Sequence, residues 1–431
     1  MPVRLDRNSA DFAQRFAGFL AMKRDVSADI ESATRAIVDD VAARGDLALI
    51  EATRKFDRLD LTPAGLRITP AEIDAAVKAC DVGTLDALKF ARDRIEVFHR
   101  RQLPKDERFT DALGVELGWR WSAIDAVGLY VPGGTAAYPS SVLMNAVPAR
   151  VAGVARVVMV VPSPDGKLNP LVLAAAHLGG VSEIYRVGGA QAVAALAYGT
   201  ATIAPVAKIV GPGNAYVAAA KRLVFGKVGI DMIAGPSEVL VIADHTGNAG
   251  WIAADLLAQA EHDVNAQSIL ITDHAALADD VERAVEAQLA TLPRAQIARA
   301  SWNEFGAIIL VKQLDDAIAL ANAIAAEHLE IMTSDPEKLA AQIRNAGAIF
   351  LGAHTPEAIG DYVGGSNHVL PTARSARFSS GLGVLDFMKR TSILKCGPDQ
   401  LRALGPAAMT LGKAEGLDAH ARSVGLRLNL S

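Results

Sequence analysis

The chain has 431 residues, of which 51% are hydrophobic and 21% charged, so it is long enough for two or three domains of an ordinary globular protein. Its formal net charge of −5 and its lack of any Lys/Arg cluster argue against nucleic acid as the main partner. Cys80 and Cys396 are the only cysteines, which excludes a disulfide framework and a cysteine zinc site and suits a reducing cytoplasm.

Neither export nor membrane insertion is expected. The first residues, MPVRLDRNSADFAQRF, carry early charges and have no apolar core, unlike a secretory signal. The uncharged span 187–207 contains glycine, proline and polar residues, which indicate a strand, a loop and a helix instead of a membrane helix. We therefore expect a cytoplasmic protein with no membrane partner.

Residues 1–119 have the pattern of a helical N-terminal region. Segments 33–57 and 69–102 repeat apolar residues every three to four positions and are rich in Ala, Leu and Arg. Thr69 followed by Pro70 is typical of a helix start.

From residue 120 onward, short β-branched runs alternate with Ala-rich segments, which predicts βαβ units and parallel sheets. In residues 120–235 the expected strands are AVGLYVPGG, RVVMVVPSP, EIYRVGGA and KIVGPG. In residues 236–381 they are EVLVIAD, QSILITD, AIILV, LEIMTSD and AGAIFLG. Residues 382–431 return to a helical pattern and are too short to fold alone. The prediction is an α/β protein with two consecutive parallel-sheet domains, a helical N-terminal region and a helical C-terminal tail.

Each strand of the first series ends in Gly or Pro, in VPGG, VPSP, VGGA and VGPG. Such loops let backbone amides approach a phosphate beyond the carboxyl ends of the strands, but ordinary βα turns use the same residues. GPGNAY (211–216) has Tyr216 where a dinucleotide fingerprint requires its third glycine. Asp231 follows Gly211 by a suitable distance, yet it sits in a turn-like segment. Any dinucleotide must therefore bind in a non-standard way.

Two Glu-His pairs, Glu261-His262 and Glu327-His328, are candidates for metal binding or proton transfer. Gln259 and His262 share one helix face, whereas Glu261 points away from His262. Two further ligands would be needed for a metal, and without them a structural histidine is the more usual interpretation.

Candidates for those ligands lie in two later segments. GDYVGGSNHVLPT (360–372) contains Asp361 and His368, and AEGLDAHARS (414–423) contains Glu415, Asp418 and His420. Their spacing is consistent with a site but does not establish one.

The second pair, Glu327-His328, falls where a predicted helix meets a predicted strand. A histidine beside a carboxylate can serve as base and acid near neutral pH. The alternative is a histidine that complements the dipole at a helix C-terminus.

These stretches together resemble the histidinol dehydrogenase family. The resemblance rests on IDMIAGPSEVLVIAD, VGLYVPGG, VGGAQAVAALAYGT, KIVGPGNAYV, LLAQAEHD, AEHLE, GDYVGGSNHVLPT and AEGLDAHARS, which occur in order along nearly the whole chain. It implies an NAD-dependent enzyme with one zinc ion per subunit that oxidises L-histidinol through L-histidinal to L-histidine in two hydride transfers. It also implies an incomplete, duplicated Rossmann-like fold in an intertwined homodimer. Residues 1–119 would then pack on the second α/β domain and on the partner.

The same resemblance assigns roles to individual residues. The implied zinc ligands are Gln259, His262, Asp361 and His420, a set that also suits manganese. The implied NAD contacts are Tyr130, Gln191 and Asn214. The implied substrate contacts are Ser237, His328, Glu415 and the zinc ligands, with Glu415 and His420 supplied by the partner subunit. Glu327 and His328 become the proton-transfer residues.

The chemistry agrees with these roles. An amino alcohol with an imidazole offers two nitrogens to a metal, so zinc would act mainly as a template. His328 would accept the hydroxyl proton in the first oxidation, and Glu327 would activate the water that hydrates the aldehyde before the second. The alternatives are a same-family dehydrogenase for another small polar alcohol, a zinc hydrolase, and a non-catalytic binding protein. The last of these should have lost Glu327 or His328.

Overall fold

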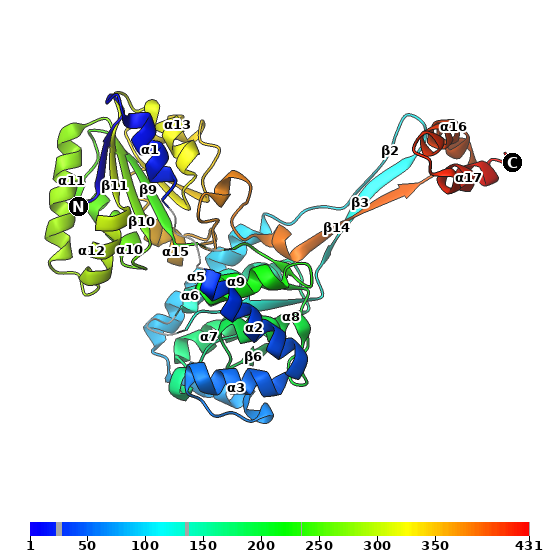
Figure 1. Cartoon of the computed structure of the whole chain (residues 1–431), viewed down its shortest axis with the longest axis horizontal. Helices are drawn as coiled ribbons and strands as arrows, with labels where there is room; N and C mark the ends of the chain where they lie inside the picture. The colour runs from blue at the N-terminus through cyan, green and yellow to red at the C-terminus, as the bar shows by residue number, and fades with distance from the viewer. Residues whose placement is uncertain (23–27, 134–137, 234, 431) are drawn as a thin grey trace.

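The computed structural model describes residues 1–22, 28–133, 138–233 and 235–430, so Gly134 of the VPGG stretch and Ala234 lie outside the described residues. Two α/β bodies lie against each other, and a long arm projects from them (Figure 1). Each body is built on one parallel sheet, as the sequence predicts.

The first sheet has five parallel strands in the order β6-β5-β4-β7-β8. They are β4 (Ala126–Tyr130), β5 (Arg156–Val160), β6 (Glu183–Tyr185), β7 (Lys208–Val210) and β8 (Gly229–Ile230). The first four are the predicted strands. All five residues of β4 are buried, because helices cover both faces, and this explains the continuous apolar run in its sequence.

Helices from two parts of the chain cover each face of this sheet. One face packs against α4 (Pro70–Ala79), α5 (Val82–Arg100), α6 (Pro139–Val151) and α7 (Pro170–Gly179). The other packs against α2 (Ala28–Arg44), α3 (Asp46–Asp57), α8 (Gly189–Tyr198) and α9 (Ala215–Val224).

The packing expected for residues 1–119 therefore needs correction. α2 to α5 cover the first α/β body, not the second, since their apolar faces complete its two cores. Within the described residues, β1 (Val3–Asp6) and α1 (Phe12–Leu20) are the N-terminal elements that join the second body.

The second sheet is also parallel, in the order β1-β11-β10-β9-β12-β13. Its strands beyond β1 are β9 (Glu238–Ala243), β10 (Gln267–Thr272), β11 (Ala307–Leu310), β12 (His328–Met332) and β13 (Ala348–Leu351), all of which the sequence predicts. One face is covered by α10 (Ala249–Ala260), α11 (Ala275–Leu289) and α12 (Ala295–Phe305). The other is covered by α1, α13 (Asp316–Ile324) and α14 (Pro336–Ala340).

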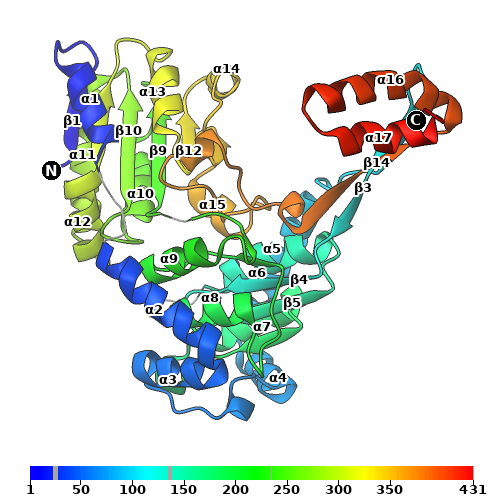
Figure 2. The same ribbon diagram turned by 45° about the vertical axis from the view of Figure 1, so that its right-hand side comes forward.

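Both sheets follow one topology. Counted along the chain within each body and leaving β1 aside, the third, second, first, fourth and fifth strands lie side by side, which is the Rossmann order without its sixth strand. In the second sheet β1 is added at the edge, next to β11. The predicted fold class, two consecutive incomplete Rossmann-like domains, is confirmed. Figure 2 shows the second sheet above α9, which belongs to the first body, and the rest of the first body below that helix.

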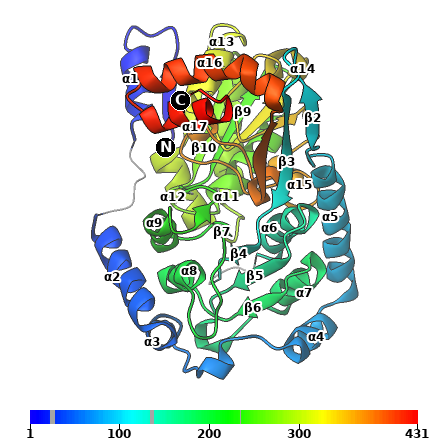
Figure 3. The same cartoon turned by 90° about the vertical axis from the view of Figure 1, so that its right-hand side faces the viewer.

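The arm is an antiparallel sheet with two helices at its tip. It contains β2 (Glu107–Thr110), β3 (Glu116–Ala123) and β14 (Met388–Lys395) in the order β14-β3-β2, followed by α16 (Pro398–Ala414) and α17 (Asp418–Arg427). Figure 3 looks along the arm, with α16 and α17 in front of the second body. The predicted helical tail is present, but it is joined to the body through β14.

The remaining elements are short. They are α15 (Glu357–Tyr362) and the single-turn helices η1 (Pro63–Gly65), η2 (Pro164–Gly166), η3 (Ser375–Arg377) and η4 (Val384–Phe387). In the part of the chain that the structure describes, no helix combines the length and the apolar character needed to cross a membrane.

Candidate active site

A cavity of about 750 Å³ lies between the two bodies. The first body contributes loops at the carboxyl ends of its strands, including Gly211 to Asn214 after β7. The second contributes residues at the amino ends of its strands. Among the predicted site residues, those that line the cavity are Asn214, Ser237, His262, Glu327, His328 and Asp361.

Glu327 and His328 enter this cavity because the chain turns sharply between α13 and β12. Ala325 has a left-handed φ of 50°, and β12 begins at His328. Glu327 and His328 are 5% and 3% exposed. Both bind the backbone of Glu238 at the start of β9: Glu327 Oε2 accepts from its amide at 3.0 Å, and His328 Nδ1 lies 3.1 Å from its carbonyl oxygen. The pair is therefore held by the register of two neighbouring strands.

The His328 ring is surrounded by carboxylates. Its Nδ1 lies 3.6 Å from Glu357 and 3.8 Å from Glu327, and its Nε2 lies 3.7 Å from Asp361. Burial opposes the charged imidazolium, but Glu357, Glu327 and Asp361 outweigh it and raise the pKa of His328 well above its usual value. Burial also disfavours a charged Asp361, yet the ion pair with His328 holds the pKa of Asp361 below its usual value.

The pKa values of the two neighbouring glutamates shift upward, opposite to that of Asp361. Burial raises the pKa of Glu327 to about 7 and that of Glu357 to about 8, although His328 opposes both shifts. A carboxyl group that titrates near neutrality can either accept or donate a proton at physiological pH. Such a pKa would suit the proton-transfer role that the family resemblance implies for Glu327.

Gln259 and His262 lie beside each other at the end of α10. Gln259 is fully buried, and its Oε1 has no hydrogen-bond partner within the described chain. Its amide nitrogen is 3.5 Å from His262 Nδ1, and the two ends of an amide group are interchangeable in such an assignment. A buried amide oxygen without a partner, beside an imidazole that lines the cavity, fits a divalent cation.

Asp361 lies across the same cavity on α15, near enough to His262 to act on its charge. Three of the four predicted metal ligands therefore face one region. The fourth, His420, is on α17 at the tip of the arm, and Glu415 caps α16 nearby (Figure 3). Both are exposed there. A single chain thus does not bring His420 or Glu415 to its own cavity.

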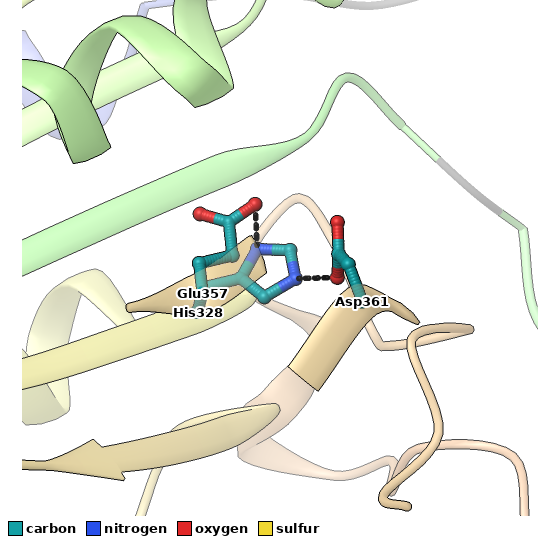
Figure 4. A group of neighbouring side chains, drawn as sticks. All are labelled: His328, Glu357 and Asp361. Atoms are coloured by element: carbon teal, nitrogen blue, oxygen red, sulfur yellow. Dashed lines mark ion pairs between the residues drawn. The ribbon is translucent and has the colours of Figure 1, made fainter. Parts of the chain in front are cut away.

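A different trio, His328, Glu357 and Asp361, has ligand atoms within 4.8 Å of one another. Figure 4 shows, however, that Glu357 and Asp361 lie on opposite sides of the imidazole, one at each ring nitrogen. The ring itself therefore fills the space between the two carboxylates. We interpret the trio as an ion-pair cluster that holds His328.

The predicted cofactor residues differ in their surroundings. Asn214 lines the cavity and caps α9, where its Oδ1 accepts from the amides of Tyr216 and Val217. Tyr130 and Gln191 are 3% and 1% exposed. The Tyr130 hydroxyl accepts from the Gly189 amide at 2.9 Å, which ties the end of β4 to the start of α8.

Sequence reasoning missed Glu357 as a neighbour of His328. Glu357 and Asp361 are four residues apart and share a face of α15, but this helix is too short to show a periodic pattern. His368, which the sequence places near Asp361, lines the cavity. Its Nδ1 is 3.0 Å from the Asp361 carbonyl oxygen, and its Nε2 is 3.1 Å from Ser141 Oγ.

Comparisons with known proteins point to one family along nearly the whole chain. A family model described as histidinol dehydrogenase matches residues 20–428. The histidinol dehydrogenases of Bradyrhizobium diazoefficiens and Nitrobacter winogradskyi are 85% and 86% identical to this chain, and each match covers 100% of both proteins. The crystal structure of histidinol dehydrogenase from Elizabethkingia anophelis is 35% identical, has a TM-score of 0.94, and the match covers 99% of this chain and 98% of that one.

Proposed function

The chain belongs to the histidinol dehydrogenase family, and we propose that it oxidises L-histidinol through L-histidinal to L-histidine with NAD as hydride acceptor and zinc as metal. One observation carries this proposal: a buried glutamate and a buried histidine border the same cavity as His262, Asp361 and the glycine-rich strand ends. That cavity offers proton transfer, metal ligands and backbone amides in one place.

His328 is the base for the first oxidation. The contact of its Nδ1 with the Glu238 carbonyl oxygen fixes the ring, and its Nε2 has no hydrogen-bond partner among the described residues. The surrounding carboxylates favour the protonated ring, so His328 must first lose a proton, which the positive charge of a bound zinc would favour. In the resulting neutral form with hydrogen on Nδ1, Nε2 accepts the hydroxyl proton of L-histidinol. The nearby carboxylates then stabilise the imidazolium that results.

Glu327 is the base for the second oxidation. An aldehyde must be hydrated before it can lose hydride, and a carboxylate beside the aldehyde can take the proton of the attacking water. Oε2 of Glu327 is held by the Glu238 amide, which fixes the orientation of the carboxyl group. Its pKa of about 7 lets Glu327 accept that proton near neutral pH.

Gln259, His262 and Asp361 would hold zinc together with His420 of the partner subunit. Because the arm carries His420 and Glu415 away from their own cavity, a homodimer in which each arm completes the other site supplies the missing groups. When bound, zinc would orient the nitrogen and hydroxyl groups of the substrate and offset the negative charge around His328.

Substrate and cofactor would approach the cavity from different bodies. Ser237 of the same subunit would contact L-histidinol. Glu415 of the partner subunit would contact it too and would supply the acceptor that the imidazole N–H of the substrate requires. Tyr130, Gln191 and Asn214 lie at the carboxyl ends of the strands of the first sheet or at the helix starts that follow, where a dinucleotide is expected to bind.

The free Cys80 and Cys396 agree with the proposed location in a reducing cytoplasm.

The deciding experiment is a stoichiometric assay. Limiting L-histidinol is added to purified protein with zinc and excess NAD, and NADH is counted by its absorbance. We expect two NADH for each L-histidinol, with L-histidine as the product. One NADH per substrate would contradict the second oxidation, and no NADH would contradict the proposed reaction. Other small amino alcohols serve as controls for the substrate.

A further inference from the structure

A buried ion pair lies beneath the loop that carries Asn214. Lys221 is on α9 and Asp231 follows β8, and Lys221 Nζ bonds Asp231 Oδ1. Their side chains are 3% and 1% exposed. The proton-transfer chemistry does not use either residue, and two opposite charges so deep in a protein must be held by good geometry to be tolerated.

The pair binds both polar groups of the Gly211 backbone. Asp231 Oδ2 accepts from the Gly211 amide at 2.8 Å, and Lys221 Nζ donates to the Gly211 carbonyl oxygen at 3.1 Å. Gly211 has a φ of 107°, and a Cβ added there would lie 2.2 Å from the Tyr130 carbonyl oxygen. Gly211 is therefore held in a conformation that other residues rarely adopt, close against the end of β4.

The contacts of Asp231 show why it does not act as the ribose-binding residue that its spacing from Gly211 suggests. In a dinucleotide-binding fingerprint, an acidic residue about 20 positions after the first glycine bonds the ribose. Here Oδ1 of Asp231 is bound by Lys221 and by the Met232 amide, and Oδ2 is bound by Gly211. Asp231 and Lys221 border the cavity, but the Asp231 side chain is only 1% exposed and both of its oxygens are engaged. Asp231 therefore holds the loop and is not free to bond a ribose.

The loop is thus fixed at both of its ends. The ion pair anchors Gly211, and the Asn214 side chain caps α9 at the other end. Pro212 and Gly213 between them line the cavity. Because the two charges cancel, the anchor adds no net charge beside the place where an anionic pyrophosphate is expected.

We propose that Lys221 and Asp231 are positioning residues for NAD: they hold Gly211 to Asn214 in the binding conformation without touching the cofactor. This inference rests on the proposed NAD dependence. A loop that must be ordered at binding reduces affinity, so loss of the pair should weaken NAD binding more than it changes the chemical step.

The test compares Lys221→Met, Asp231→Asn and the double variant in the zinc-loaded dimer. Lys221→Met leaves an uncompensated carboxylate and is the variant most prone to misfolding. The double variant removes both charges, keeps one acceptor oxygen for Gly211, and should fold. Arg156→Met is the matched control, because the Arg156–Glu183 pair lies at the opposite, amino end of the same sheet.

We expect the Kd and KM for NAD to rise at least about tenfold in Asp231→Asn and to recover in part in the double variant. Bound zinc, kcat and the KM for L-histidinol should change by less than about twofold. Arg156→Met should lower Tm and leave NAD binding unchanged. Folded Asp231→Asn and double variants with the wild-type Kd for NAD would overturn the inference. Wild-type protein that fails to bind NAD would overturn the proposed function and this inference with it.

Discussion

Asp244 and Ser334 bridge the carboxyl ends of β9 and β12: the amide and the hydroxyl of Ser334 both donate to Asp244 Oδ2 at 2.8 Å. Thr246 donates to the other carboxylate oxygen through its amide and its hydroxyl. This bridge fills the gap where the strand order reverses, which is where sheets of this type bind ligands. At the matching gap of the first sheet, between β4 and β7, Gly211 and its loop instead face the cavity. Two halves with one topology thus differ in what occupies that gap.

Asp244→Asn should destabilise the protein at neutral pH. Burial disfavours the charged carboxylate, but the donors of Ser334 and Thr246 outweigh it and lower the pKa of Asp244 to about 2. Relative to the ordinary pKa of about 3.9 for an aspartate, this depression corresponds to about 2 kcal/mol of free energy of unfolding. Because the folded-state pKa is depressed, this stability is present above about pH 4 and is lost as pH falls toward 2. Urea titrations at pH 7 and pH 3 measure the difference.

The control for this prediction is Asp273→Asn, because Asp273 follows β10 as Asp244 follows β9 but is exposed. Its effect on the urea midpoint should be small at both pH values. A difference between Asp244→Asn and the wild type that stays constant down to pH 3 would show that the carboxylate charge is not the source of the stability.

His328→Ala should lower turnover at least about 100-fold while zinc stays bound. In the proposed mechanism His328 transfers protons, whereas Gln259, His262 and Asp361 would hold the metal. Turnover with L-histidinol and zinc content are measured on the same preparation. His274→Ala is the matched control, since His274 caps α11 outside the cavity. Stoichiometric loss of zinc from His328→Ala would refute this division of roles.

Glu327→Gln should separate the two oxidations. The amide side chain keeps an oxygen for the Glu238 amide, so the local structure is preserved, but it cannot accept the proton of the attacking water. We expect L-histidinal to be oxidised at least about 100-fold more slowly, and the yield of NADH per L-histidinol to fall toward one. Equal slowing of both oxidations would argue against a separate role for Glu327.

The sequence predicts most strands of both parallel sheets, but it misses the edge strands β1 and β8 and the strands of the arm, for one physical reason. Strands such as β4 and β9 are buried on both faces, so each is a continuous apolar run. All four residues of β2 are exposed, and most of β14 is exposed too, so their sequences carry no alternation that marks a strand.

The candidate site shows a similar division. Short-range patterns indicate the Gln259-His262 pair and the Glu327-His328 pair, but they leave structural roles open for both. The contact of Glu327 and His328 with Glu238 depends on the register between β9 and β12, which no local pattern contains. Asp231 shows the limit of spacing arguments, because the expected distance from Gly211 belongs to a residue with a different role.

Gln259→Ala and His262→Ala should lose zinc and activity together. Each substitution removes one of the groups that would hold the metal, and loss of one ligand should weaken zinc affinity at least about tenfold. Zinc content after dialysis and competition with a chromophoric chelator measure this without relying on turnover. Gln288→Ala is the control, because this glutamine bonds the Gly250 carbonyl oxygen outside the cavity. Full activity after exhaustive chelation of the wild type would contradict a metal-dependent reaction.

His420→Ala should be inactive alone and complemented by an equally inactive His262→Ala. If each arm completes the other site, a mixed dimer has one intact site, which combines His262 of one subunit with His420 of the other. The purified mixed dimer should then show roughly half of the wild-type activity, because one of its two sites is intact. The two variants are co-expressed with different affinity tags, and the doubly tagged dimer is assayed for NADH formation and zinc content. If His420 served its own subunit, the mixed dimer would have no intact site, and no activity would return.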